Sequence, residues 1–426
     1  MNNVKRNIIL INQFIMKKTF NLLLICTLIV LSIYSCKKKE DAPVDLATLP
    51  FTQETVSESK TNLATTGTQL VDETQKMSNS AGVEAINSFS NLNISSPSLK
   101  SASIFQPLNT IATSGDITAI VNSLSAVTED PTTLQQTFDQ LKGIHTWNNN
   151  KWVITASSTV LQFIFPSKKG GLINDAQLTV TYVGVIPKKA ISTYTGDLPK
   201  SFNITLTVAS AKVAEYNVEA TYSDDGIPAT FSSFIAVTPF KIGVEWTYST
   251  ANISAKYYFT DADKTIIEFG ENTAGNFNSN YLDGSSIPEN VVDNANAYFQ
   301  VLNIKLAGQL DYKSIVADKK ALPLIMTDSM RNWSAADMYN KHALLVLIYA
   351  DSKQKIAQAE AYAVKTTSTY YFGSTQYKYE NWNTELRFIF PDKTKGDIKA
   401  YFETGFSDLQ KSFDKLVTDL QTKFGN

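Results

Sequence analysis

Cysteine and histidine are nearly absent from this sequence, which contains two of each in 426 residues. Cys26 lies inside an apolar run near the N-terminus and Cys36 lies at its end, so the chain after Cys36 contains no cysteine. That part cannot form a disulfide, use a thiol as a nucleophile or bind a metal through sulfur. Its stability must come from the size of its core.

Motifs that mark common active sites are also missing. The sequence contains no Gly-x-Ser-x-Gly nucleophile motif and no Gly-rich loop that could hold a phosphate. His145 and His342 are far apart, and we interpret each as a structural or surface residue, with His342 opening an apolar strand. Paired carboxylates are the one catalytic arrangement that the composition permits. We predict that the candidate pairs lie at hairpin ends, where turn formation explains them without catalysis: Asp224-Asp225, Asp261/Asp263 and Glu268/Glu271. We therefore expect no enzyme activity and predict no catalytic, cofactor-binding or metal-binding residue.

Basic residues do not dominate the charge. The first 35 residues contain four Lys or Arg and no acid, so the chain from Cys36 onward has 34 basic and 40 acidic residues, a net charge of −6. Nucleic-acid binding needs clustered Lys and Arg that neutralise phosphates. The mildly acidic composition therefore argues against a nucleic-acid partner.

The stretch Met16–Cys36 has the layout of a secretory signal. Lys17-Lys18 forms a short basic start, Phe20–Tyr34 is almost entirely apolar, and Ser35 precedes Cys36. The alternative is an uncleaved membrane span, but crossing the hydrocarbon takes about 20 apolar residues and this run is shorter. We predict a signal peptide over residues 1–35, with translation starting at Met16 and cleavage between Ser35 and Cys36.

The residues Ile33, Ser35 and Cys36 resemble the lipobox of bacterial lipoproteins. The resemblance implies that the Cys36 thiol is acylated, that cleavage follows, and that the new amine is acylated too. Several acyl chains give stable anchoring, whereas one chain of myristoyl length gives only marginal binding. The expected partner is therefore membrane lipid, held through the acyl chains on Cys36.

The charged run Lys37–Asp41 resembles the segment that follows the cysteine in surface-exported lipoproteins of Bacteroidota-type bacteria, although a solvated charge run gives the same pattern. Lys37 stands where enterobacterial lipoproteins retained at the inner membrane have Asp. This resemblance implies the cell envelope, at the outer membrane, on either its periplasmic or its surface face.

Composition and periodicity divide the rest of the chain. Residues 36–50 are polar and contain two prolines, which predicts a lipidated tether. Residues 51–142 predict a helical layer: Val56, Leu63, Leu70 and Met77 recur every seven residues, Val83, Ile86 and Phe89 continue the stripe, and further helices are expected at 117–124 and from Pro131.

From residue 143 to 426 the sequence predicts an antiparallel-sheet body. Apolar residues alternate with polar ones through successive segments such as Phe202–Val208 and Phe240–Tyr248, with turns at Asp224–Gly226 and Asp261–Lys264. Later strands are expected at 298–310, 342–350, 355–365, 369–379 and 385–390, with short helices near 312–319 and 335–340. Residues 397–424 predict a C-terminal amphipathic helix. The fold class is α+β: a large curved antiparallel sheet, a meander resembling a half-barrel, covered by the N-terminal helices and the C-terminal helix.

Two stretches share a pattern, Leu161–Gly170 and Leu386–Gly396. Each has Leu-x-Phe-x-Phe facing one side, a Pro that ends strand pairing and a Lys/Gly turn. A duplication and two independent strand ends both explain the likeness. Trp147-Asn148 and Trp382-Asn383 precede the two stretches at different distances. Together with the signal segment, the Trp-Asn and Phe-Ile-Phe-Pro pieces resemble uncharacterised secreted lipoproteins of Bacteroidota-type bacteria, a likeness that covers a tenth of the chain and assigns no functional residue.

Function remains open between two classes. The first is a membrane-anchored envelope lipoprotein that binds without catalysis or is structural, and whose curved apolar face could carry a hydrophobic ligand, as in the half-barrel lipoprotein chaperones it resembles. The second is a surface glycan-binding or glycan-hydrolysing protein that uses exposed aromatics and carboxylates. The aromatic residues concentrate in Tyr370–Trp382, which we interpret as half core and half surface of a sheet.

Overall fold

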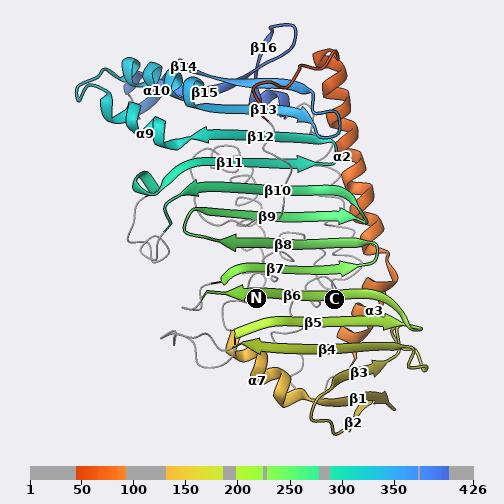
Figure 1. The fold of residues 1–426 in the computed structure, drawn as a ribbon. Helices are drawn as coiled ribbons and strands as arrows, with labels where there is room; N and C mark the ends of the chain where they lie inside the picture. The colour runs from red at the N-terminus through yellow and green to blue at the C-terminus, as the bar shows by residue number, and fades with distance from the viewer. Residues whose placement is uncertain are drawn as a thin grey trace.

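A single open sheet of 16 strands organises the molecule (Figure 1). The computed structural model describes residues 45–92, 131–185, 198–223, 228–277, 288–372 and 375–402. From β3 onward each strand pairs antiparallel with the next along the chain, as the alternating sequence predicts. At the other edge β1 lies parallel to β3 and antiparallel to β2, so the sheet is mixed.

The strands and helices follow in chain order. The strands are β1 (Gly143–Asn148), β2 (Lys151–Thr155), β3 (Leu161–Phe165), β4 (Ala176–Val185), β5 (Leu198–Val208), β6 (Ala211–Tyr222), β7 (Pro228–Val237), β8 (Phe240–Tyr248), β9 (Asn252–Asp261), β10 (Lys264–Gly275), β11 (Val292–Val301), β12 (Ile304–Asp311), β13 (Ala343–Tyr349), β14 (Lys355–Phe372), β15 (Thr375–Ile389) and β16 (Lys395–Asp397). The helices are α2 (Val56–Ser78), α3 (Ala81–Asn91), α7 (Pro131–Leu141), the 3-10 turn η2 (Pro288–Asn290), α9 (Tyr312–Ala321) and α10 (Asp328–His342). The predicted α+β class with a curved sheet is confirmed.

Helix α2 begins with a capping box in which Thr55 accepts from the Glu58 backbone and Glu58 accepts from the Thr55 backbone. The helix then runs beside one set of strand ends (Figure 1). Its predicted stripe is buried: Leu63 packs with residues of β12 and β13, and Leu70 and Met77 join the main core with α3. The seven-residue spacing therefore predicted both the helix and its buried side.

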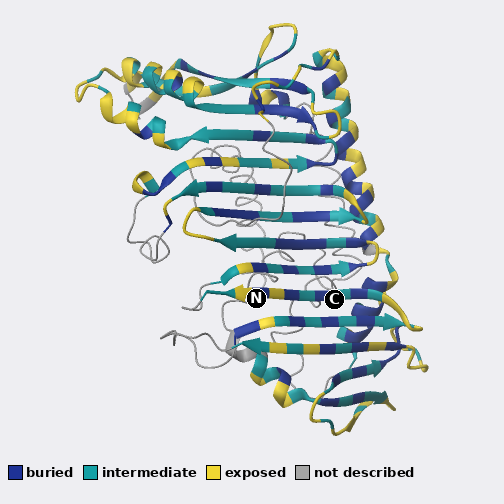
Figure 2. Cartoon of the chain, viewed as in Figure 1, coloured by how far each residue is buried: buried dark blue, intermediate teal, exposed yellow. Residues whose placement is uncertain are grey.

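The two faces of the sheet differ in character. On the face that carries α2 and α3, apolar side chains from β3 to β10 form a continuous core that includes Phe163, Phe202, Tyr216 and Phe259. The opposite face, called the outer face below, is more polar, so burial alternates along many strands (Figure 2). This alternation is the period-two pattern expected of a sheet with one dry side.

Several predicted strand boundaries are wrong. Residues 298–310 form two strands, because the chain turns at Leu302, where φ is 50°. Residues 369–379 contain the tip of the β14–β15 hairpin, and 385–390 is the end of β15 rather than a new strand. His342 ends α10 instead of opening a strand, and α10 extends well beyond the predicted residues 335–340.

The tether ends earlier than predicted. Leu46 is buried in a cluster with Ala307, Val346 and Ile348 on β12 and β13. The backbone of Lys355 pairs with Pro50 and Thr52, and its ammonium group donates to the Ala47 carbonyl. Residues 45–50 are therefore part of the body.

Several predictions fall outside the described residues. These are the signal peptide with Ser35 and Cys36, the helix at 117–124, and the part of the C-terminal helix beyond residue 402.

Candidate functional site

A strip of partly exposed apolar residues crosses the middle of the helix-bearing face. Tyr257 lies opposite Phe269, Phe269 opposite Phe299, and Phe299 opposite Leu306, on four adjacent strands from β9 to β12. These side chains are only partly buried, and Phe299 is 43% exposed. Next to this row runs a row of small residues that includes Ala297 and Gly308. We call these two rows the central strip: Tyr257, Phe269, Glu271, Ala297, Phe299, Leu306 and Gly308.

The central strip lies between two packed regions. On one side α2 packs over the strand ends through Leu63 and Leu70. On the other side Phe277, Val291, Val292 and Ile253 form a separate buried cluster. An exposed aromatic side chain between two well-packed regions offers apolar area that a ligand could cover.

Glu271 is the one carboxyl group in the central strip. It lies opposite Ala255 on β9 and Ala297 on β11, and the nearby Tyr257 has its own pKa raised, mainly by burial and in part by the charge of Glu271. Within the described residues Glu271 has no hydrogen-bond or ion-pair partner. Burial therefore raises its pKa to about 8. At neutral pH the Glu271 carboxyl is therefore mostly protonated and can donate a hydrogen bond.

Glu268, on the same strand, faces the other way. It forms an ion pair with Lys256 at 2.8 Å and accepts a hydrogen bond from the Tyr298 hydroxyl at 2.7 Å. The Tyr298 ring lies over Gly270, where an added Cβ would come within 2.5 Å of the ring. Glu268 and Glu271 are thus in the middle of β10, and their predicted placement at a hairpin end is wrong. Asp261 ends β9 and Asp263 lies in the β9–β10 turn, as predicted, while Asp224-Asp225 lies outside the described residues.

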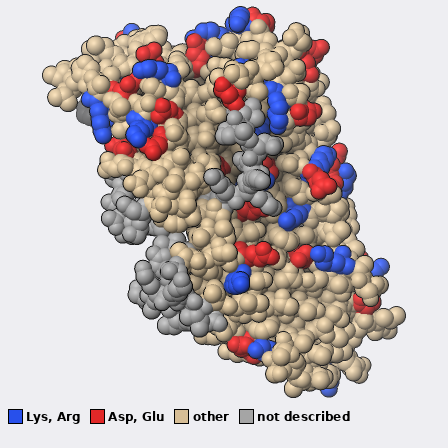
Figure 3. All heavy atoms as spheres, in the orientation of Figure 1, with Lys and Arg blue, Asp and Glu red and all other residues tan. Residues whose placement is uncertain are grey.

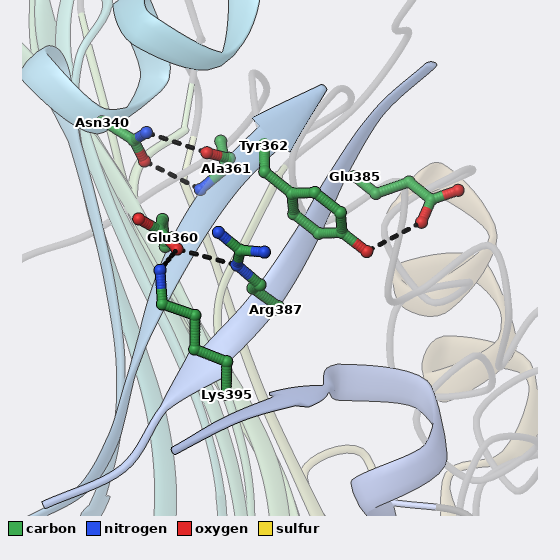
Figure 4. A network of polar contacts seen from close by, with 7 residues as sticks. All are labelled: Asn340, Glu360, Ala361, Tyr362, Glu385, Arg387 and Lys395. Carbon is green, nitrogen blue, oxygen red and sulfur yellow. Dashed lines mark hydrogen bonds and ion pairs between the residues drawn. The ribbon is translucent and has the colours of Figure 1, made fainter. Parts of the chain in front are cut away.

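The β14–β15 hairpin extends beyond the sheet as a two-stranded arm, held at its base by polar contacts (Figure 4). The Asn340 side chain accepts from the Ala361 N–H and donates to its carbonyl, both at 2.8 Å, so α10 takes the place of a neighbouring strand. Glu360, the residue before Ala361 on β14, forms ion pairs at 2.8 Å with Arg387 on β15 and with Lys395 on β16. The Arg387 guanidinium lies 4.3 Å from the centre of the Tyr362 ring.

The arm exposes aromatic residues. Tyr377 and Tyr379 are 44% and 47% exposed, and the alternating residues from 376 to 380 are exposed as well. The segment was predicted to be half core and half surface, and the two tyrosines fit the surface half. The core half is missing from 376 to 380, where both sides of the strand are exposed. Trp382 is partly buried, and its ring centre lies 6.4 Å from that of Trp333 on α10.

The histidines take structural positions. His145 is buried and stacks on Phe163 at 4.6 Å, and its Nε2 lies 2.9 Å from the Leu141 carbonyl. The His342 ring lies 2.8 Å from Asp318, and this contact, with Lys341, holds the pKa of Asp318 below its usual range. No three His, Cys, Asp or Glu side chains come close enough to hold a metal ion in the described parts of the chain.

Sequence reasoning missed the central strip, although one signal was present. Phe269 and Glu271 are two residues apart in an alternating strand, which puts a carboxyl on the same side as an aromatic ring.

Among the helices that the structure describes, none is both long enough and apolar enough to cross a bilayer. The chain matches no known family model, no curated protein and no solved structure.

Proposed function

We propose that this chain is a membrane-anchored lipoprotein of the cell envelope that binds a hydrophobic ligand, without catalysis, on the central strip. The observation that carries the proposal is the combination of exposed Phe299 with partnerless Glu271 on an otherwise apolar face. An acyl chain would cover the aromatic row, and its head group would take the hydrogen bond that Glu271 lacks. The lipobox-like residues at Cys36 support anchoring.

Binding can be measured with the fluorescent apolar probe N-phenyl-1-naphthylamine, displaced by fatty acids or phospholipids. Phe299→Glu places a charge in the central strip, and binding should weaken at least tenfold. The matched control is Asn296→Glu, because Asn296 is exposed on the same strand but lies on the outer face. Equal probe affinity in the two variants would rule out the central strip as the site.

Anchoring has a separate test. Cells that express the wild type or Cys36→Ser are grown with labelled palmitate and then fractionated. The wild type should carry label and remain with membranes after a carbonate wash, and the variant should do neither. Label on the variant would show that Cys36 is not the acylated residue.

A second candidate is glycan binding by the arm, favoured by the exposure of Tyr377 and Tyr379. Tyrosine rings stack on the apolar faces of sugars. A glycan array probed with the wild type and with a Tyr377→Ala/Tyr379→Ala variant tests this function. A signal that the double variant loses would support it, and a blank array would eliminate it.

A further inference from the structure

The connection between α9 and α10 forms an exposed apolar tip. Leu324 and Ile325 are fully exposed, and Met330 and Trp333 on the first turns of α10 are more than half exposed. We call Leu324, Ile325, Met330 and Trp333 the apolar tip. It projects from one corner of the molecule, at the upper left of Figures 1 and 2. Adjacent apolar side chains that stay in solvent cost free energy unless another surface covers them.

The charge around the apolar tip differs from that of the whole body. Residues 312–342 contain five Lys or Arg and three Asp, whereas the chain from Cys36 onward is acidic overall. Lys320 lies in the last turn of α9 and Arg331 on α10 beside Met330, while Lys319 in the same turn of α9 forms an ion pair with Glu289 at 3.5 Å. In Figure 3 the corner consists of uncharged atoms, with charged side chains gathered below it. Apolar residues with a Trp and adjoining cations match the chemistry of a bilayer interface with anionic head groups.

The path of the N-terminal segment brings this corner towards the membrane. Residues 45–50 pack on β12, β13 and the start of β14, and α9 and α10 are the insertion between β12 and β13. Only eight residues lie between Cys36 and Asp45, and the nine residue-to-residue steps reach at most about 30 Å when fully extended. An acyl anchor on Cys36 would therefore hold this end of the sheet close to the lipid.

We propose that the apolar tip inserts into the bilayer interface as a second membrane contact, which sets the orientation of the anchored body. The proposal rests on the proposed envelope location. Insertion of the apolar tip does not depend on ligand binding by the central strip and can be measured without acylation of Cys36, whereas the orientation of the body uses both the tip and the Cys36 anchor. The sheet would then stand with its β12–β16 end at the membrane and its β1–β4 end away from it.

The β3–β4 loop supplies a matched control. Leu172 and Ile173 are also adjacent and exposed. They lie near the opposite edge of the sheet, which eight to ten strand spacings of about 4.8 Å put roughly 40–50 Å away. An upright body inserts only the apolar tip, whereas a body lying flat on the bilayer would bring both loops to the lipid.

The chain after the predicted cleavage site has no cysteine once Cys36→Ser is introduced, so single thiols can be placed at will. Ile325→Cys and Ile173→Cys are each added to Cys36→Ser and labelled with an environment-sensitive dye. The proteins are then mixed with vesicles of four parts phosphatidylcholine and one part phosphatidylglycerol. The dye at 325 should shift to the blue and be quenched by lipid-borne quenchers, while the dye at 173 should not respond.

A second measurement uses vesicle flotation. Leu324→Asp/Ile325→Asp should lower vesicle binding of the non-acylated protein at least tenfold, and Leu172→Asp/Ile173→Asp should leave it within twofold. No response of the dye at 325, or equal losses in the two double variants, would overturn the proposal. Because the protein in both assays is not acylated, these outcomes are independent of the palmitate test.

Discussion

Replacing Glu271 by Gln should stabilise the fold by an amount that grows as the pH rises from about 5 to 8 and then levels off. The pKa of this carboxyl is about 8 in the folded protein, against an ordinary value of 4.5, because burial disfavours its charged form. The folded state therefore holds a proton that the unfolded state has released between pH 4.5 and 8. In that window the wild type loses stability as pH rises.

The size of the effect follows from the shift. Each pKa unit corresponds to about 1.36 kcal/mol, so a shift from 4.5 to about 8 sets an upper bound of ~5 kcal/mol. Glu271 is only partly buried, and solvent screening reduces this value to about 2–3 kcal/mol. Gln is neutral at every pH, so the variant should match the wild type at pH 5 and exceed it by this amount at pH 9.

Urea unfolding of ligand-free protein at pH 5, 7 and 9 measures the difference directly. Glu268→Gln is the matched control, since Glu268 lies on the same strand but pairs with Lys256 and Tyr298 on the outer face. This control should not stabilise the fold at any of the three pH values. A Glu271→Gln variant that is stabilised equally at pH 5 and pH 9, or not at all at pH 9, would refute the reasoning about the central strip.

Three further variants test how the body is held together. Burial disfavours the ionisation of Glu73, but hydrogen bonds and charges from Lys264 and Lys76 outweigh it and lower its pKa. Glu73→Gln should therefore cost about 1–3 kcal/mol at pH 7, and the cost should shrink as the pH falls below the ordinary value and through the lowered pKa of Glu73, as urea unfolding along a pH series would show. Gly275→Ala would bring a Cβ within 2.1 Å of the Val291 carbonyl oxygen and should lower the free energy of unfolding by about 1–3 kcal/mol. At Gly308 the nearest atom to an added Cβ is 3.5 Å away, so Gly308→Ala should change the free energy of unfolding by no more than about 0.5 kcal/mol. Similar melting temperatures for the two variants would contradict the packing described. Asn340→Ala leaves the N–H and the carbonyl of Ala361 unpaired and should lower the free energy of unfolding by about 1–3 kcal/mol. Amide hydrogen exchange at residue 361 should become faster, and unchanged exchange there would show that Asn340 does not hold the arm.

The sequence predicted elements whose periodicity is long and regular. The spacing of Val56, Leu63, Leu70 and Met77 predicted α2, and alternation predicted β5, β6, β8 and β9 because each has one dry face. The ends of the strands were predicted less well, because they depend on where the turns lie. The β11–β12 turn consists of Leu302 and Asn303, and the positive φ falls on Leu302, a residue type that rarely adopts it. Asn303 is the one turn-forming residue type there, and a single Asn in an apolar segment is a weak signal.

The candidate site was harder to predict, for a physical reason. Alternation shows which residues share a side of one strand, but how much of that side is covered depends on elements far away in the chain. Phe299 is exposed and Phe259 is buried, although both are aromatic residues on the same face of the sheet. Likewise, the prolines in 36–50 predicted a tether, and only the contacts of Leu46 and Lys355 show where the body begins.

Native mass spectrometry of the protein recovered from its own cells tests the central claim most directly. The wild type should carry a co-purifying hydrophobic molecule that is removed by denaturation, in addition to the covalent mass on Cys36. Phe299→Glu should keep the covalent mass and lose the bound molecule, and Asn296→Glu should keep both. A wild-type protein whose mass is fully accounted for by its acylated chain would contradict the binding function proposed for the central strip.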